Sequence, residues 1–181
     1  MSLSPTPTIS FHEHELVPKE IQNLPICVTL LIHRVSIDNV LGDIEASICV
    51  APMSTLRHCG IKEADLSQSS ISILAFDNTR RPSLGAITLI VEIGPLSMPV
   101  EFHIVDVESP FNAILGRPWI TPLNAVPSVA HQYLKFPYEE KVVKFHNVNL
   151  PEPDQEQEKL LAAPANEKPL FIYHGYYIAH N

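Results

Sequence analysis

Two groups of side chains in this sequence have types that could bind a metal or react through sulfur. The segment His12-Glu13-His14 could present two imidazoles on one face of a strand, but no further ligand cluster accompanies it, so we interpret it as a solvated segment. The cysteines are odd in number and widely spaced, which supports neither a disulfide framework nor a CxxC metal site. They are Cys27, Cys49 and Cys59. We expect buried free thiols, no metal site and no cofactor.

Two aspartates, Asp38 and Asp43, precede a predicted strand at 48–50. An isolated aspartate before a β-strand is most often a turn or cap residue, because its carboxylate accepts hydrogen bonds from nearby backbone amides. Taken alone, neither aspartate predicts catalysis.

Composition limits the class of protein that this chain can be. With 181 residues, 45% of them hydrophobic, the chain can bury the core of one ordinary domain and leave residues for tails. A net charge of −8, with no basic cluster larger than Arg80-Arg81, argues against direct nucleic-acid binding. The apolar runs are shorter than the roughly 20 residues that cross a bilayer, and the start, MSLSPTPTIS, does not resemble a signal peptide. We expect a soluble cytoplasmic or nuclear protein without a membrane span.

The predicted elements are mainly short strands. Seventeen prolines and six glycines argue against long helices. Runs rich in Val, Ile, Thr and Phe predict strands at 26–32, 48–50, 70–76, 86–93, 99–107 and 141–145. Val100, Phe102 and Ile104 alternate with Glu101 and His103, which suits a sheet with one buried face. An all-β barrel or sandwich is the expected class.

One segment is typical of a short helix instead. Residues 52–60 have proline near the start and glycine where a helix would end. We expect about two turns of helix in this segment.

Four strings of the sequence carry a family resemblance: PMSTLRHCGI (52–61), AFDNTRRPSLG (75–85), NAILGRPWI (112–120) and AVPSVAHQYLKFP (125–137). In this order and at similar separations, they resemble the protease region of plant gypsy-type retrotransposon polyproteins. The resemblance extends over about 9–148. It implies an all-β, retropepsin-like (acid protease) closed barrel with one or two short helices.

The resemblance also implies a domain organisation. Residues 1–20 would form an N-terminal extension, and 21–148 the retropepsin-like domain. An acidic, proline-containing linker follows at 149–168, where core periodicity is lost. The aromatic tail at 169–181 could add an edge strand or be part of a following region.

The activity implied is that of an aspartic endopeptidase acting on peptide or polyprotein. This chemistry needs two carboxylates that share one proton, one acting as base toward water and the other donating to the carbonyl. With one catalytic aspartate per chain, the site would exist only at the twofold axis of a homodimer.

The resemblance assigns residues to the flap and to a structural turn. Residues 75–81 would form the flap, which closes over the peptide and excludes water; its tip would include Phe76, Asp77 and Asn78. The alternative is a plain hairpin with an Asp-Asn turn. The structural turn behind the catalytic loop would be Ile114, Leu115, Gly116 and Arg117. Arg117 could instead be an ion-pair partner, and Trp119 a core anchor.

The catalytic tripeptide of the family is Asp-Thr-Gly, Asp-Ser-Gly or Asp-Asn-Gly. The family's interval to the PMSTL-like string fits Asp43 without a gap, whereas Asp38 would need five extra residues. We therefore assign Asp43 as the candidate catalytic residue and interpret Asp38 as a turn residue. The tripeptide is then Asp43-Ile44-Glu45.

Three substitutions at this loop predict impaired catalysis. Ile44 cannot form the hydrogen bond that braces the two loops across the dimer. Glu45 replaces the glycine with a Cβ and a further negative charge, which would obstruct a sharp turn and disfavour ionisation of the dyad. Gly42 weakens the approaching strand.

Three other interpretations remain open at this point. The chain could be a non-catalytic β-barrel remnant that binds peptides or dimerises. It could be a decayed reading frame. It could also be an all-β interaction domain unrelated to proteolysis, although that would leave the four ordered strings unexplained.

Overall fold

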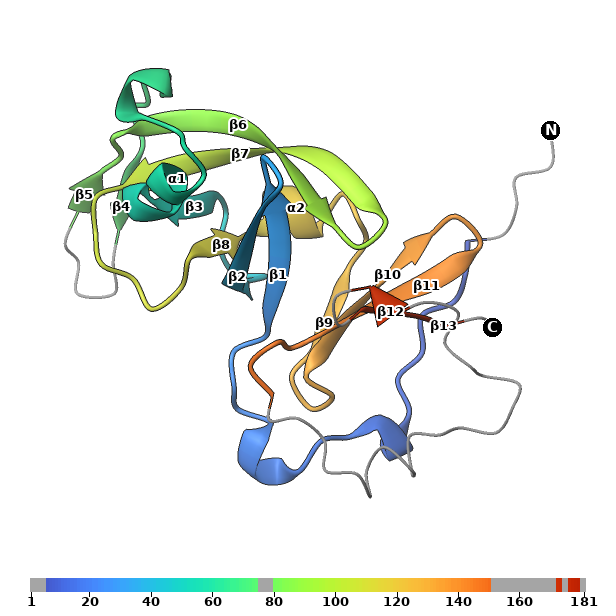
Figure 1. Ribbon diagram of the computed structural model, residues 1–181. Coiled ribbons are helices and arrows are strands. Elements are labelled where there is room, and N and C mark those ends of the chain that lie inside the picture. Colours follow the sequence, from blue (N-terminus) through green and yellow to red (C-terminus); the bar gives the residue numbers. More distant parts are fainter. Residues whose placement is uncertain (1–5, 75–79, 151–171, 174–175, 180–181) are drawn as a thin grey trace. The chain divides into compact units, whose positions relative to one another are not determined.

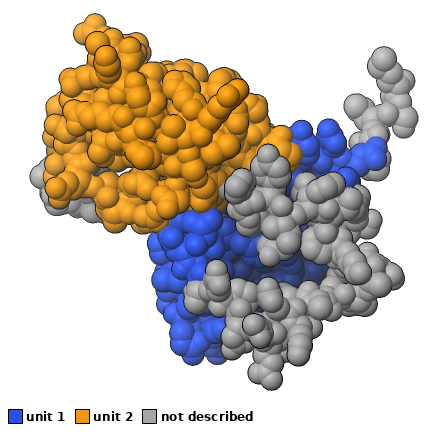
Figure 2. Space-filling view, viewed as in Figure 1, with its two compact units in different colours: residues 1–27, 123–181 blue, residues 28–122 orange. Residues whose placement is uncertain are grey.

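The computed structural model describes residues 6–74, 80–150, 172–173 and 176–179. The chain forms two compact units, coloured separately in Figure 2. Unit 1 comprises Met1–Cys27 and Leu123–Asn181, and unit 2 comprises Val28–Pro122. Both divisions fall inside the predicted domain at 21–148, whose boundaries stay a prediction.

Unit 2 is built on a closed six-stranded barrel with the order β1-β2-β8-β3-β7-β6. Its strands are β1 (Cys27–Ile32), β2 (Val35–Gly42), β3 (Cys49–Pro52), β6 (Gly85–Ile93), β7 (Leu96–Val105) and β8 (Ala113–Leu115). The β6–β7 hairpin is its most extended pairing (Figure 1). Strand β8 pairs in parallel with β2 and antiparallel with β3. It therefore lies between the strand that leads to Asp43 and the strand that follows the 43–48 loop.

The barrel interior follows from the alternation of the strands. In β6, Leu89, Val91 and Ile93 are buried, whereas Thr88 and Glu92 are exposed, as expected for a strand with one face on the core. Further core residues come from the neighbouring strands: Leu30, Ile32, Val40, Phe102, Ile104 and Leu115. The predicted all-β closed barrel is confirmed.

One residue breaks the alternation predicted for β7. His103 was expected on the exposed face with Glu101, but it is buried. Its Nδ1 lies 3.3 Å from the hydroxyl of Ser69, and its Nε2 lies 3.5 Å from the Glu101 carboxylate. The Ser69 hydroxyl gives one ring nitrogen a hydrogen-bond partner and the Glu101 carboxylate lies near the other, so a histidine can be buried at this position.

Two short α-helices accompany the barrel. α1 (Met53–His58) follows Pro52 directly, and Gly60 has a φ of 77° just beyond its end, which confirms the helix predicted at 52–60. The hydroxyl of Thr55 in α1 donates a 2.7 Å hydrogen bond to the carbonyl of Asn112, just before β8. α2 (Arg117–Ile120) was predicted only as part of a turn. A short 3-10 helix, η3 (Glu63–Asp65), lies between α1 and the next strand.

A separate two-stranded hairpin completes unit 2. It consists of β4 (Ser72–Leu74) and β5 (Arg80–Pro82), with Ile73 opposite Arg81. Ser83 fixes its base, because its amide donates to the carbonyl of Ile71 and its hydroxyl donates to the carbonyl of Ile104 in β7. The hairpin thus projects from a point tied to the barrel.

Unit 1 contains a five-stranded sheet with the order β12-β13-β11-β10-β9. The strands are β9 (Val126–Ser128), β10 (Tyr133–Tyr138), β11 (Lys141–His146), β12 (Ile172–Tyr173) and β13 (Tyr176–Ala179). The aromatic tail adds strands to this sheet, since β13 pairs antiparallel with β11. Two 3-10 helices, η1 (Glu13–Glu15) and η2 (Lys19–Ile21), precede β1.

The N-terminal segment is held to the sheet of unit 1 by polar side chains. The amide of Gln132 donates to the carbonyls of Gln22 and Leu24, and the amide of Asn147 donates to the carbonyl of Pro25. The carboxylate of Glu15 accepts hydrogen bonds from Lys135 and Lys144. Among the described residues, no helix is long and apolar enough to span a membrane.

Candidate active site

The candidate catalytic loop begins where β2 ends against β8. Gly42 pairs with Leu115, and the amide of Asp43 then donates a 3.0 Å hydrogen bond to the carbonyl of Leu115. The carboxylate of Asp43 accepts a 2.8 Å hydrogen bond from the amide of Glu45. Both the backbone amide and the side-chain carboxylate of Asp43 are therefore held by hydrogen bonds within the chain. β2 extends through Gly42, so this glycine does not end the approaching strand early.

The loop presents the two unusual residues to its outside. Ile44 is 51% exposed, although isoleucine is ordinarily buried. Glu45 is exposed as well. Neither has a positive φ, so a Cβ at position 45 fits within a single chain. Any obstruction by Glu45 would have to come from a group that faces the loop.

Gly116 packs so closely behind the loop that no other residue fits without movement. A Cβ added at Gly116 would lie 2.4 Å from the carbonyl oxygen of Ile48 and 2.6 Å from that of Ala46. The next amide, that of Arg117, donates a 2.9 Å hydrogen bond to the carbonyl of Ala46. The amide of Gly116 donates to the sulfur of Cys49 at 3.3 Å. The predicted turn at 114–117 thus contacts the 43–49 segment directly.

The remaining residues around this turn differ in their surroundings. Leu115 and Trp119 are buried, so Trp119 is in a position to anchor the core. Arg117 is exposed and forms no ion pair with a residue that the structure describes. Burial raises the pKa of the Cys49 thiol, only partly opposed by the amide of Gly116. All three cysteines are buried without a disulfide, as predicted.

Asp38 does not lie in a turn, which corrects our interpretation of it. It lies within β2, and its carbonyl and carboxylate both accept hydrogen bonds from the side-chain amide of Asn112. The Asp-Asn sequence favours a turn locally, and Asn39 does have a φ of 52°. The pairing of β2 with β8 nevertheless continues the strand past both residues.

The predicted flap corresponds in sequence to the β4–β5 hairpin. Its expected tip residues, Phe76, Asp77 and Asn78, lie outside the described residues. The described strands on either side pair antiparallel, which both the flap and the plain-hairpin interpretations predict. Their assignment as substrate-binding residues stays a prediction.

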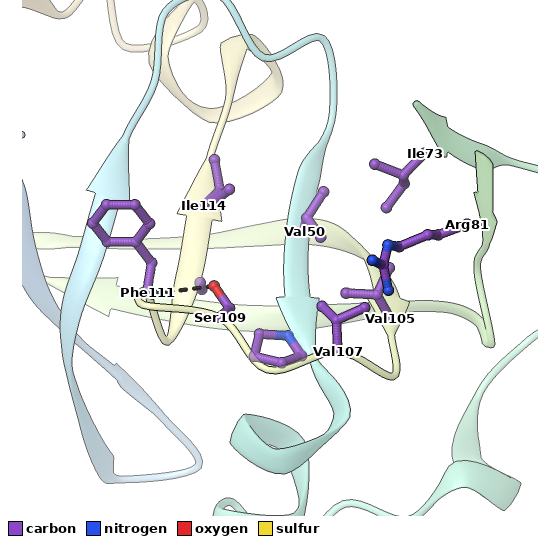
Figure 3. A pocket seen from close by; sticks show the side chains of 10 residues that line it. Val50, Ile73, Arg81, Val105, Val107, Ser109, Phe111 and Ile114 are labelled. Atoms are coloured by element: carbon purple, nitrogen blue, oxygen red, sulfur yellow. Dashed lines mark hydrogen bonds between the residues drawn. The ribbon is translucent and has the colours of Figure 1, made fainter. Parts of the chain in front are cut away.

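An apolar pocket of about 180 Å³ opens between this hairpin and the barrel (Figure 3). Figure 3 shows Ile73 and Arg81 on one side, Ile114 and Phe111 on the other, and Val50 between them. The full lining is Val50, Pro52, Ile73, Arg81, Val105, Val107, Ser109, Phe111, Ala113 and Ile114. Ile114 immediately precedes Leu115, whose carbonyl binds the amide of Asp43. The pocket and the candidate loop therefore share strand β8.

Sequence reasoning predicted few of these lining residues as site residues. Ile114 was assigned to the structural turn, and Arg81 to the end of the flap. Val50 and Val105 fall within the predicted strands at 48–50 and 99–107, but hydrophobic alternation gives no sign that their side chains line a pocket. Whether these side chains line a pocket depends on how β3, β7 and β8 are arranged. That arrangement comes from pairing between segments that are distant in the sequence.

The structure offers no metal site among its described residues. No group of three or more His, Cys, Asp or Glu side chains there could hold an ion. The rings of His12 and His14 stack at 5.4 Å; His12 is the N-cap of η1 and His14 lies within it, so neither is on a strand.

Comparison with known proteins defines the fold class. The retroviral protease-like domain of Ddi1 from Leishmania major matches 72% of this chain and 97% of its own, with 17% identity and a TM-score of 0.52. The EIAV protease matches 58% of this chain and 93% of its own, with 15% identity and a TM-score of 0.49. A retropepsin-like aspartic protease from Rickettsia conorii matches 56% and 75%, with 16% identity and a TM-score of 0.43. No family model and no curated protein matches the sequence. The chain has the retropepsin-like fold.

Proposed function

We propose that this chain is a catalytically impaired aspartic endopeptidase-type domain derived from a retrotransposon polyprotein, which binds extended peptide but does not cleave it above background. The observation that supports this most is the position of Asp43. It directly follows β2, and its amide binds the carbonyl of Leu115, whose neighbour Ile114 lines an apolar pocket that could hold a substrate side chain. Peptide hydrolysis by aspartates needs a pair of carboxylates within reach of a cleft that holds the substrate, and β8 joins the Asp43 loop to such a cleft.

The proposed enzyme is a homodimer, because the chemistry needs two carboxylates. Each chain contributes one Asp43, and the partner's loop would supply the second across a twofold axis. One aspartate would be ionised and act as base toward water, while the protonated one donates to the peptide carbonyl. Ile44 offers no polar atom to brace the paired loops. Glu45 would add one negative charge per chain near the dyad and oppose its single ionisation.

A second function is supported by the contrast between pocket and loop. Most of the side chains that line the pocket are aliphatic, whereas the tripeptide lacks both family residues after Asp43. A module that only binds peptide would need the pocket but not an intact catalytic tripeptide.

Cleavage and binding measurements separate these functions. The purified chain is incubated with a peptide mixture at mildly acidic pH, with and without pepstatin, beside the Asp43→Asn variant. We expect the same background from both proteins and peptide binding by both. Pepstatin-sensitive cleavage lost in Asp43→Asn would contradict the proposed impairment. A chain that neither binds peptide nor self-associates would contradict both functions.

A further inference from the structure

Arg81 brings a positive charge to the lining of a pocket whose other side chains are apolar except for Ser109. Among the ten lining residues it is the only one with a charge, and its side chain is exposed. Figure 3 shows its guanidinium beside Val105 and Val107. With the residues that the structure describes, this guanidinium forms no ion pair and no hydrogen bond. Ile73, which pairs with Arg81 across the β4–β5 hairpin, also lines the pocket. The positive charge of Arg81 therefore belongs to the wall of the pocket.

The size and lining of the pocket define the side chain that it takes. An apolar cavity of about 150 Å³ holds one benzene ring, so a volume of about 180 Å³ accommodates one leucine, isoleucine or phenylalanine side chain. The opening next to Arg81 favours a carboxylate, which a guanidinium binds with two parallel hydrogen bonds. Asp106 and Glu108 flank Val107, but they are exposed and do not line the pocket.

We infer that this pocket selects an extended peptide with an aliphatic or aromatic anchor and an aspartate or glutamate within two positions of it, and that Arg81 determines this specificity. The inference rests on the proposed function, since it names the substrate class of the same site. In an extended peptide, residues two apart lie on one face, so an anchor in the pocket and an acid beside Arg81 are compatible. The chain carries a net charge of −8, which disfavours acidic peptides in general and makes a local cation necessary.

The test compares matched heptapeptides in NMR titrations of the full chain. The probes are Thr-Gln-Thr-Leu-Thr-Glu-Thr, its mirror order with glutamate before leucine, and versions with glutamine in place of glutamate. We expect one glutamate peptide to bind about two- to fivefold more tightly than its glutamine match, the range of a partly exposed ion pair. The preference should fall as salt is raised.

Two variants assign the preference to Arg81. Arg81→Glu should abolish it and favour a lysine-containing peptide, whereas Arg34→Glu makes the same change of charge at the exposed β1–β2 turn and should leave it intact. Arg81→Gln serves if the reversed charge unfolds the chain. Equal binding of glutamate and glutamine peptides by the unmodified chain would overturn the inference and leave the proposed function standing. Failure of every peptide, including those with the leucine anchor, would overturn both.

Discussion

The amide of Asp43 donates a 3.0 Å hydrogen bond to the carbonyl of Leu115, joining two residues that are far apart in the chain. This contact continues the parallel pairing of β2 with β8. The barrel strands therefore fix the position of the candidate catalytic loop. The same strand supplies Ile114 to the pocket. The geometry of the loop and of the pocket is therefore coupled through β8.

Gly116→Ala tests how closely β8 and the loop are packed. The added methyl group would contact two carbonyl oxygens at 2.4 and 2.6 Å, so the 46–48 backbone must move. We expect a loss of about 3 kcal/mol in the free energy of unfolding, at the upper end for overpacking, together with shifted amide resonances over 43–48.

Gly60→Ala is the control for this substitution. Gly60 has a φ of 77° and no atom within 4 Å of an added Cβ, so only backbone strain of about 1 kcal/mol is expected. If Gly116→Ala costs no more than Gly60→Ala and leaves the loop resonances unchanged, the close packing is wrong.

Asn147→Leu tests the polar clamp of unit 1, by which we mean the hydrogen bonds of Gln132 and Asn147 that hold the N-terminal segment to the sheet. Asn147 accepts a hydrogen bond from the amide of Cys27 and donates to Pro25 and Gln132, and both its side chain and that of Gln132 are buried. Leucine would leave these groups without a partner, at an expected cost of about 2–4 kcal/mol. Chemical unfolding measures it, with the exposed Gln68→Leu as a control. A loss of under about 0.5 kcal/mol would show that the clamp contributes little.

Acid should destabilise unit 1 through His146. Burial, reinforced by the positive charge of Lys144, lowers the pKa of His146 from 6.5 to about 4. Since the unfolded state takes up a proton near pH 6.5 and the folded state does not until about pH 4, stability falls as the pH drops through this window. A shift of this size corresponds to roughly 3 kcal/mol. His146→Gln should flatten this pH dependence, measured by hydrogen exchange of amides 133–146. An unchanged slope in the variant would rule out His146 as its source.

Glu15 should extend the acid sensitivity to lower pH. Burial would raise the pKa of Glu15, but the hydrogen bond and charge of Lys144, with the charge of Lys135, outweigh it and lower the pKa from 4.5 to about 2. The resulting stability is present above pH 4.5 and is lost as the pH falls toward 2. Hydrogen exchange should show Glu15→Gln less stable than the unmodified chain above pH 4.5, with the difference vanishing near pH 2. A constant difference at every pH would contradict this. Cleavage assays must therefore be done above the pH at which unit 1 opens.

Local signals in the sequence predicted the parts of the fold that depend on local chemistry. Residues 52–60 have a proline suited to a helix start and a glycine suited to a helix end, and α1 forms there. The alternation of residues 100–104 predicted most of the buried face of β7, but His103 is buried because Ser69, a residue distant in sequence, gives its ring a hydrogen-bond partner. Its burial could not be predicted from β7 alone.

The sequence predicted the candidate site best at a position where only one residue type fits. The resemblance placed Gly116 behind the loop, where the structure has it in contact with Ala46 and Ile48. Asp38 was misassigned because its local Asp-Asn pattern competes with the pairing of β2 and β8. The pocket needs five separate segments to converge, and no short window of sequence contains that information.

The most direct test of the proposed function restores the catalytic tripeptide with Ile44→Asn and Glu45→Gly together. Autocleavage and cleavage of a fused polyprotein segment are followed at mildly acidic pH, with Asp43→Asn added as the control. We expect the restored chain to cleave at least about a hundredfold faster than the unmodified chain, with pepstatin sensitivity and complete loss on Asp43→Asn. A restored chain that folds and self-associates like the original and still does not cleave would contradict the assignment of Asp43 as the catalytic residue.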